Sequence, residues 1–140
     1  MADNAAVIRG IYEALSRGDV AAVLAAMDEH IEWHEAEHFT YWPGGAFTGP
    51  QAVVAGVFAR IAQDLQDFRI DVRRVVAAGD TVLVEARYRG SVRATGKTFD
   101  AQAAHVWDLR NGKVVRFQQY VDTWLFVQAT GIAPRERALA

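Results

Sequence analysis

The sequence predicts an α+β domain in which three N-terminal helices pack on a strongly curved antiparallel sheet and enclose an internal pocket. Two observations support this prediction. Apolar residues recur with helical spacing in the first half of the chain, and β-rich runs separated by turn signals fill the second half. Helices followed by consecutive hairpins are typical of α+β domains. The length of 140 residues fits one domain over residues 1–140.

Capping residues delimit the three predicted helices. Asp3 can cap the first helix, which ends at Gly18, and Asp19 can cap the second. The third helix is expected to run from about Pro50, in its first turn, to Leu65. Each predicted helix carries an apolar face, which in the first helix consists of Val7, Ile8, Ile11 and Leu15.

The β-rich runs cover residues 68–77, 82–93, 98–109 and 114–121. Turn signals separate them at Gly79-Asp80, Thr95-Gly96 and Asn111-Gly112. If the last two turns are two-residue loops, the apolar side chains of neighbouring strands share one face, and a slip of one residue would invert it. Placing Phe68 and Val76 on that face requires a bulge or an odd-length loop at Gly79.

This register places small side chains beside an acid. Ala101 lies between Gly90 on one neighbouring strand and Asp122 on the other, and Ala103 follows on the same face. Native interiors rarely tolerate voids, so the space beside these small residues predicts a ligand pocket with Asp122 in its wall. The predicted border of this pocket is formed by Asp122, Tyr120 and His105.

The last predicted strand has a second apolar stripe on its opposite face. Val115, Phe117 and Val121 would point away from the helices and would be exposed in a monomer. An apolar outer stripe favours a homodimer that forms through the convex face of the sheet.

The composition excludes several classes of protein. Hydrophobic residues make up 51% of the chain, which argues against disorder, and the near balance of 15 basic and 17 acidic residues gives no electrostatic case for nucleic acid or an anionic membrane as partner. The sequence has no cysteine, so thiolate chemistry and disulfides are absent. Neither a signal peptide nor an apolar run of roughly 20 residues is visible, and a cytoplasmic protein is expected.

Several short motifs occur in order along the chain: SRGDV at residues 16–20, DEHIEW at 28–33, FTGP at 47–50 and GDTV at 79–82. The stretch HVWDLRNGKVVRFQQYVD follows at residues 105–122. With these motifs the chain resembles the SnoaL-like polyketide cyclases of the nuclear transport factor 2-like superfamily, which also includes ketosteroid isomerases and limonene-epoxide hydrolases.

The resemblance implies a cone-shaped domain with a deep pocket, commonly a homodimer. In the cyclases an aspartate on the final strand acts as general acid or base, and Asp122 matches it. A histidine on the preceding strand often lines the pocket, and His105 matches that position. Fold likeness alone does not assign chemistry, because many members of the superfamily only bind ligands.

Each candidate has an alternative interpretation. Asp122 could cap the strand end or pair with an arginine, and His105 could be a core histidine bonded to Gln118. Tyr120 could donate a hydrogen bond to a ligand oxygen, whereas Glu35 fits an exposed or ion-paired side chain better than a second pocket acid. The remaining side chains expected to line the pocket are Trp33, Tyr12, Tyr41, Trp42, Phe47, Phe58, Tyr88, Ala101, Ala103 and Gln118.

Residues 34–38 read HEAEH and match the zinc motif H-E-x-x-H. That motif binds zinc on a helix, where residues four apart share one face. Here the neighbouring residues predict a strand, on which residues four apart are separated by roughly 13 Å. We therefore expect no metal site and no other cofactor.

The sequence thus predicts a cofactor-independent acid–base enzyme of the cyclase or isomerase type that acts on a small apolar, oxygenated ligand. In this hypothesis Asp122 moves a proton at a carbon next to a carbonyl group, while His105 or Tyr120 holds the enolate oxygen. Two alternatives stay open. The chain could be a non-catalytic module that binds an apolar ligand, or a dimerisation domain whose cavity is filled by Trp33, Trp42 or Phe58.

Overall fold

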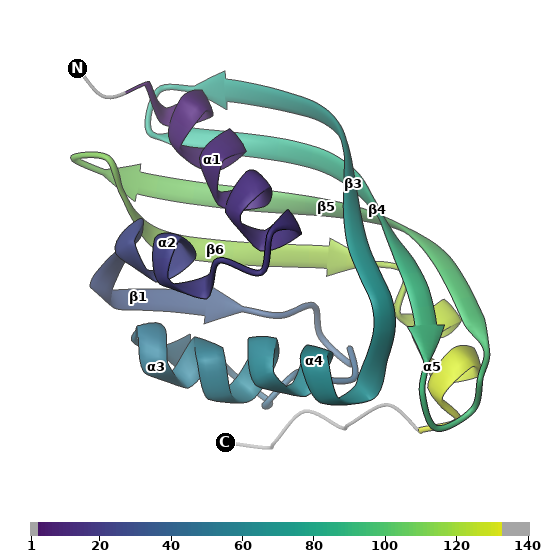
Figure 1. Cartoon of the computed structure of the whole chain (residues 1–140). Coiled ribbons are helices and arrows are strands. Elements are labelled where there is room, and N and C mark those ends of the chain that lie inside the picture. The colour runs from purple at the N-terminus through teal and green to yellow at the C-terminus, as the bar shows by residue number, and fades with distance from the viewer. Residues whose placement is uncertain (1–2, 133–140) are drawn as a thin grey trace.

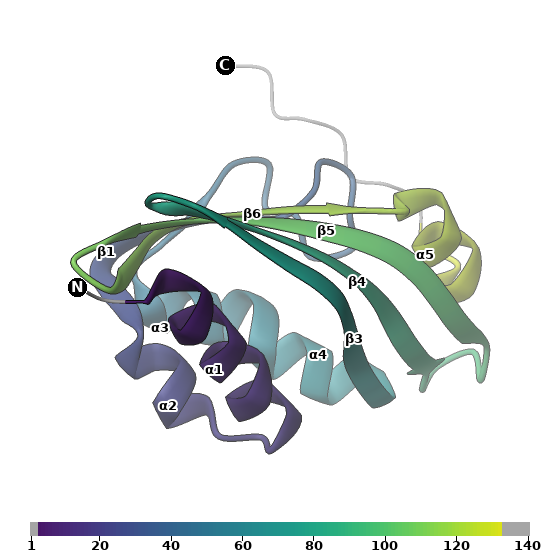
Figure 2. The same ribbon diagram turned by 90° about the horizontal axis from the view of Figure 1, so that it is seen from above.

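A computed structural model describes residues 3–132, which form a six-stranded sheet with helices on its concave face (Figure 1). The strand order is β2-β1-β6-β5-β4-β3. Seen from above, the sheet curves over α1, α2, α3 and α4, while α5 lies at the far end of the long strands (Figure 2). The α+β class and the curved, cone-shaped sheet agree with the expectation from the sequence.

The strands pair antiparallel except at one position. Near the middle of the sheet, β1 runs parallel to β6, a pairing between distant parts of the chain that the hairpin pattern does not predict. The described strands are β1 (Met27–His34), β2 (Phe47–Thr48), β3 (Leu65–Ala78), β4 (Thr81–Val92), β5 (Thr98–Arg110) and β6 (Lys113–Val121).

The first two helices begin as predicted. α1 (Asn4–Ser16) is capped by the Asp3 carboxylate, which accepts a hydrogen bond from Ala6 N, and α2 (Val20–Ala25) is capped in the same way by Asp19. A further helix, α5 (Thr123–Thr130), lies outside the sequence prediction. The helix count of three is therefore too low for the described residues.

The predicted third helix is a continuous helical segment with an irregular middle. It consists of α3 (Pro50–Val53), a π-helical turn, η1 (Val54–Phe58), and α4 (Ala59–Asp64). Gly56 lies in the π-helical turn, where an added Cβ would come within 2.2 Å of the Phe47 ring. Glycine at this position therefore lets the Phe47 ring pack directly against the helical backbone.

Replacing Gly56 with alanine should lower the free energy of unfolding. Overpacking costs about 1–3 kcal/mol, which exceeds the roughly 1 kcal/mol that alanine gains over glycine in a helix. Gly10 in α1 is the matched control, because an added Cβ there has no described neighbour within 4 Å. Urea unfolding should show destabilisation by Gly56→Ala and stabilisation by Gly10→Ala. Stabilisation by both would contradict the tight packing of the Phe47 ring.

The face assignment of β4 and β5 is confirmed, although their offset differs from the prediction. Tyr88 lies opposite Ala101, and Gly90 lies opposite Phe99. The connection after Val92 is longer than the two-residue loop assumed at Thr95-Gly96. A shift of two residues keeps every side chain on its predicted face, because side chains alternate with a period of two.

A bulge changes the register of β6. Leu109 pairs with Val114 as predicted, but a shift between Asp108 and Leu109 places Trp107 opposite Phe117. Such a bulge adds one residue to one strand and moves the following side chains to the other face. The prediction for this strand is therefore wrong after the bulge: the inward side chains are Phe117, Gln119 and Val121, and the outward ones are Arg116, Gln118 and Tyr120.

β3 also contains bulges, but not at Gly79. The register shifts between Val72 and Arg74, and again between Gln66 and Arg69. Gly79 and Asp80 form a two-residue turn between Ala78 and Thr81. As a result Val76 points outward and is exposed, contrary to the prediction that it faces the helices.

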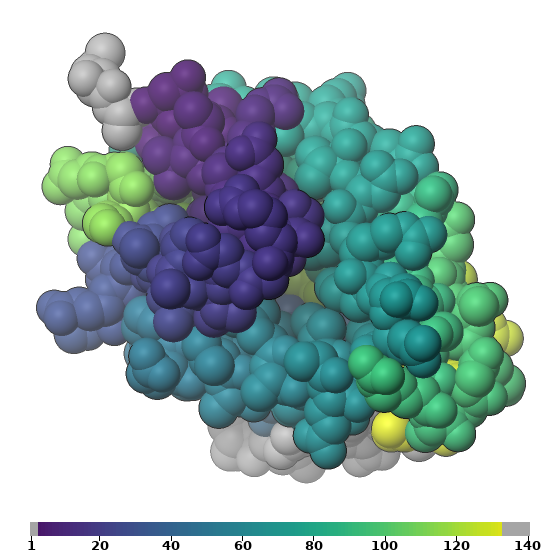
Figure 3. All heavy atoms as spheres, in the orientation of Figure 1, coloured from purple at the N-terminus to yellow at the C-terminus, as the bar shows by residue number. Residues whose placement is uncertain are grey.

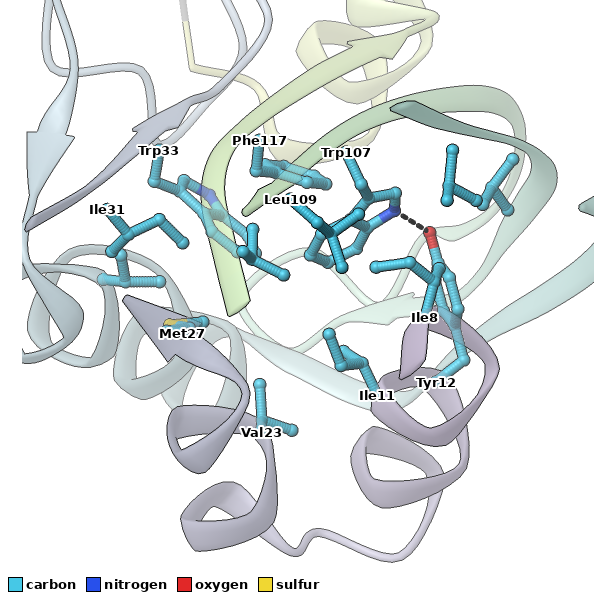
Figure 4. Packing of buried hydrophobic residues seen from close by; sticks show 14 of the residues in the cluster. Ile8, Ile11, Tyr12, Val23, Met27, Ile31, Trp33, Trp107, Leu109 and Phe117 are labelled. Atoms are coloured by element: carbon cyan, nitrogen blue, oxygen red, sulfur yellow. Dashed lines mark hydrogen bonds between the residues drawn. The ribbon is translucent and has the colours of Figure 1, made fainter. Parts of the chain in front are cut away.

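Two hydrophobic clusters fill the space between the sheet and the helices. The first cluster contains Trp33, Trp107 and Phe117, and it packs α1 and α2 against the sheet (Figure 4). In the second cluster, Phe126 of α5 packs with Phe99 at a ring distance of 4.7 Å.

The predicted void beside Gly90 and Ala101 is occupied. A Cβ added to Gly90 would lie 3.1 Å from both the Phe68 backbone and the Phe99 ring. Ala101 is fully buried in the same cluster as Phe126. The small residues thus accommodate aromatic side chains of the protein itself, and the location of the pocket predicted from them is wrong.

Candidate functional site

An apolar cavity lies elsewhere, between the concave face of the sheet, α1 and the helical segment of residues 50–64. Its volume is about 40 Å³, enough for a few water molecules. The wall is almost entirely apolar, with Trp33, Tyr41, Phe58, Phe68, Trp107 and Phe117 as its main aromatic members. Figure 4 shows Trp33, Trp107 and Phe117 packed together on the sheet side and Tyr12 reaching in from α1.

A row of hydrogen bonds crosses the polar part of this wall. The indole N–H of Trp107 donates to the Tyr12 hydroxyl oxygen at 3.0 Å, and the Tyr12 hydroxyl contacts His105 Nδ1 at 2.5 Å. On the other side of the imidazole, His105 Nε2 bonds to the Tyr88 hydroxyl, which also accepts a hydrogen bond from Gln119 Nε2 at 3.0 Å.

Gln119 connects this row to the backbone. Its Oε1 accepts a hydrogen bond from Ala36 N at 3.0 Å, which fixes the orientation of the amide. Since Gln119 Nε2 donates to Tyr88, the bulge in β6 is what supplies a donor to the row. The prediction that His105 faces Gln118 is corrected by the same bulge, because its partner across the strands is Gln119.

His105 is uncharged in this setting. It is 2% exposed, and burial lowers its pKa from 6.5 to about 3. A neutral imidazole has one N–H, so it donates to one tyrosine and accepts from the other. If Nε2 carries the proton, the Tyr88 O–H has no acceptor within the row. If Nδ1 carries it, the Tyr12 O–H has none. One tyrosine O–H is therefore available to a ligand in either tautomer.

Glu35 contributes a carboxyl group to the same cavity. Its side chain is 3% exposed, and burial raises its pKa from 4.5 to about 8. The Trp33 indole and the positive charge of Arg60 act in the opposite direction. The Glu35 charge in turn raises the pKa of the Tyr88 hydroxyl, after burial as the main cause. Glu35 and the tyrosine row are thus electrostatically coupled.

The parallel pairing of β1 with β6 places Glu35 in the wall. Trp33 lies opposite Phe117 and stacks on it at a ring distance of 3.8 Å, which fixes the inward face of β1. Glu35 lies two residues further and has the same orientation as Trp33. The alternation of side chains along this segment is a sequence signal that Glu35 shares the face of Trp33. The prediction that the Glu35 side chain is exposed is wrong.

The Trp33 indole is a second polar group with an unusual environment. Trp33 is 4% exposed, and its Nε1 interacts with the Glu35 carboxyl group but makes no hydrogen bond within 3.5 Å to residues 3–132. Buried N–H groups are normally paired. Trp33 and Glu35 both line the cavity, so the indole N–H and the carboxyl group lie side by side in its wall.

The structure places the other predicted site residues as follows. Six of them line the cavity: His105, Trp33, Tyr12, Tyr41, Phe58 and Tyr88. Three buried or half-buried residues do not: Phe47 packs on Gly56, and Ala101 and Ala103 belong to the second hydrophobic cluster. Trp42 is also buried outside the cavity, where it contacts the His38 ring.

Asp122, Tyr120 and Gln118 lie outside the cavity. Asp122 caps α5, where its Oδ1 accepts a hydrogen bond from Leu125 N, and Tyr120 is 56% exposed on the convex face. Gln118 shares that face because of the bulge and donates to the backbone oxygen of Gln119. The bulge in β6 and the helix that follows it thus place Asp122 outside this cavity, contrary to the prediction that it lies in the pocket wall.

The H-E-x-x-H match does not lie on a helix. His34 ends β1, and His38 lies in the turn that follows. Within residues 3–132 we find no group of three or more histidine, aspartate or glutamate side chains arranged to hold a metal ion. In the same part of the chain no helix has the length and apolar character needed to cross a membrane.

Comparison with known proteins identifies the family. Residues 8–117 match the model of the SnoaL-like domain. The chain belongs to the SnoaL-like domain family. No curated protein matches the sequence of this SnoaL-like chain.

Solved structures share the fold of this SnoaL-like domain. A nuclear transport factor 2-like protein from Burkholderia thailandensis E264 is 35% identical, with 92% of this chain and 98% of that one covered and a TM-score of 0.87. TerC, co-crystallised with polyporic acid, is 26% identical, with 91% and 98% covered and a TM-score of 0.81. A proposed SnoaL-like polyketide cyclase from Jannaschia sp. CCS1 is 17% identical, with 94% and 93% covered and a TM-score of 0.80.

Proposed function

We propose that this SnoaL-like protein is a cofactor-independent acid–base enzyme of the cyclase or isomerase type, acting on a small apolar, oxygenated molecule. The observation that supports this most directly is a buried carboxyl group, Glu35, in the same apolar cavity as a row that offers a tyrosine O–H. A carboxyl base and hydroxyl donors in an apolar site are the groups that proton abstraction beside a carbonyl requires.

In the proposed reaction, Glu35 takes a proton from the carbon next to a substrate carbonyl. The electron pair of the broken C–H bond forms the enolate, and a tyrosine O–H from Tyr12 or Tyr88 donates a hydrogen bond to its oxygen. Glu35 then returns the proton to another carbon in an isomerisation, or to the product oxygen after ring closure. His105 acts in this scheme as the group that orients the two hydroxyls.

Replacing Glu35 with glutamine tests this proposal without a known substrate. In D2O, loss of the α-proton signals of aromatic and terpenoid ketones reports enolisation by NMR. We expect Glu35→Gln to slow this exchange at least 100-fold, since general-base groups contribute about 10²–10⁴-fold. The exchange rate of the native protein should rise with pH up to about 8, the pKa of Glu35.

Asp122→Asn is the matched control, because asparagine also caps helices well and Asp122 lies outside the cavity. This variant should keep the native exchange rate. Loss of exchange in Asp122→Asn together with normal exchange in Glu35→Gln would return the role of base to Asp122 and reject the proposed site.

The small cavity volume favours a second candidate function. Ligand sites usually enclose about 300–1,000 Å³, whereas this cavity holds about 40 Å³ and is lined by Trp33 and Phe58. The chain could therefore act as a binding or dimerisation domain whose cavity is mostly filled by its own aromatic side chains. An absence of exchange with every ketone, in both native protein and Glu35→Gln, would support this candidate.

We also propose that the protein is a homodimer through the convex face of the sheet. The stripe predicted from Val115, Phe117 and Val121 does not support this, because Phe117 points into the core. Other apolar side chains on that face do: Leu83 is 46% exposed, and Val76 and Tyr120 are exposed too.

Light scattering at micromolar concentration tests the dimer. The native protein should have twice the mass of one chain, and Leu83→Glu should shift it towards the monomer, because a buried unpaired charge is costly at an interface. A monomeric native protein would contradict the proposed interface.

A further inference from the structure

An open groove adjoins the cavity on the outside of the cone. It lies between the C-terminal end of α1, α4 and the beginning of β3, and its volume is about 490 Å³. In Figure 3 the surface is hollowed where the atoms of α1 and α2 meet those of β3 and α4. The groove is lined mainly by apolar residues, including Leu15, Val20 and Ile61.

The same side chains form the floor of the groove and the wall of the cavity. Tyr12, Phe58, Ile61, Leu65, Phe68 and Ile70 contribute to both spaces. Two of them are aromatic rings that pack on cavity residues: Phe58 on Trp33 and Phe68 on Tyr88. A molecule that occupies the groove is therefore separated from the cavity by these shared side chains.

The charge of the groove is positive. Arg69 and Arg93 line it, and no acidic residue is among the described residues that do. Neither guanidinium group lies within 4.0 Å of a carboxylate of residues 3–132. In the same part of the chain, six other arginines form such ion pairs: Arg17, Arg73, Arg74, Arg87, Arg89 and Arg116.

Arg69 lies opposite Arg89 across β3 and β4. The Arg89 guanidinium is itself ion-paired with Asp71 and Asp100, so the positive charge of the groove comes from Arg69 and Arg93 among its described lining residues. Arg69 Nη1 has a weak hydrogen bond of 3.4 Å to the backbone oxygen of Asp67, which leaves its other donors for solvent or a ligand. Guanidinium groups bind carboxylates through paired N–H donors.

We propose that the substrate is an amphiphilic carboxylate, whose acidic group binds to Arg69 and Arg93 while its apolar part extends past Phe58 and Phe68 towards Glu35. The orientation follows from the cost of burying charge. A carboxylate would lose its hydration in the apolar cavity, whose wall has no cationic side chain among residues 3–132, but keeps it in the open groove. The orientation of the ligand rests on the proposed function, which places the reacting part of the substrate at Glu35. The negative charge of the ligand does not rest on it.

Binding of 6-phenylhexanoate and of its methyl ester tests the proposal by isothermal titration calorimetry. The two ligands share the apolar part and differ in the charge. We expect the acid to bind about tenfold more tightly than the ester, as one to two charge-assisted hydrogen bonds would give. The preference should weaken in 0.5 M NaCl, because exposed charges are screened.

The double variant Arg69→Gln/Arg93→Gln should reduce the affinity for the acid about tenfold and leave the ester unchanged. Arg110→Gln is the matched control, since this exposed arginine lies at the end of β5 and does not line the groove. Circular dichroism confirms that each variant is folded.

Equal affinities for acid and ester, a preference that survives in the double variant, or no binding of the acid at millimolar concentration would each overturn the proposal. Glu35→Gln separates this result from the proposed function. If the charge proposal holds and the catalytic one fails, Glu35→Gln keeps both the acid preference and the native rate of proton exchange. If the reverse is true, Glu35→Gln abolishes exchange in a protein that does not distinguish acid from ester.

Discussion

Replacing Glu35 with glutamine should raise the free energy of unfolding at pH 9 by up to about 5 kcal/mol, and should change it little at pH 4. Burial raises the Glu35 pKa from 4.5 to about 8 in the folded protein. Each pKa unit corresponds to about 1.4 kcal/mol. Ionised Glu35 is therefore one of the largest single costs to the stability of the fold at high pH.

The direction follows from proton binding. Between pH 4.5 and about 8, the folded protein holds a proton on Glu35 that the unfolded chain has released. Stability must then fall as the pH rises through this range, and Glu35→Gln removes the fall. His105 has the opposite dependence, because its pKa of about 3 lies below 6.5, so its contribution is lost as the pH falls from 6.5 to 3. Since both proteins contain His105, that contribution cancels in the difference.

Urea unfolding of both proteins between pH 4 and pH 9 measures this difference. Glu29→Gln is the control, because the Glu29 side chain is 84% exposed. We expect the native and Glu29→Gln curves to run parallel, and the Glu35→Gln curve to separate from them above pH 5. Three parallel curves would show that Glu35 is not held in an apolar environment.

Truncating Phe126 to alanine should cost about 3–5 kcal/mol of the free energy of unfolding, as is usual for a buried phenylalanine. Phe126 is 2% exposed and packs on Phe39 and Phe99, at ring distances of 4.9 and 4.7 Å. The truncation would open a space next to Phe39 and Phe99, in the hydrophobic cluster that also contains Ala101. Benzene should then raise the melting temperature of the variant more than that of the native protein.

Trp124→Ala on the same helix is the matched control. The Trp124 side chain is 65% exposed, so its loss should change the free energy of unfolding by less than about 0.5 kcal/mol. A cost below 1 kcal/mol for Phe126→Ala would mean that α5 is not docked on the sheet as described. Urea unfolding at neutral pH is sufficient for both variants.

Local patterns predicted most of the fold. The helix caps at Asp3 and Asp19 and the turn at Asn111-Gly112 are short-range signals, and the structure confirms each of them. The face of β5 was also predicted correctly, despite a wrong loop length, because an error of two residues preserves the alternation of side chains.

The site was harder to predict than the fold, because one extra residue in β6 decides which side chains of that strand face the core. The bulge near Leu109 places Trp107 opposite Phe117, with the two rings 4.5 Å apart, and nothing in the turn sequence indicates it. It moves Tyr120 to the outside and Gln119 to the inside. The identity of the pocket acid depended in turn on the parallel pairing of β1, which brings together parts of the chain about 80 residues apart.

The sequence contains signals for the start and end of α5 that the strand pattern obscures. Asp122 has the side chain of a helix cap, and Gly131 has a positive φ of 73° at the end of the helix, where glycine is favoured. The prediction of Asp122 in a pocket wall is incompatible with these signals, because its carboxylate caps the helix. Phe126, which packs on the Phe99 ring that lies beside Gly90, follows four residues later.

The arrangement of His105 between two phenols has a consequence for substrates with more than one oxygen atom. Moving the imidazole proton from one nitrogen to the other, with matching rotation of the two hydroxyls, transfers the unused O–H from Tyr88 to Tyr12. Neither of the two end states contains an ion, so each of them avoids the cost of a buried charge. A rigid wall can thereby serve two different oxygen positions in turn, as an oxygen-rich ring would present during successive proton transfers.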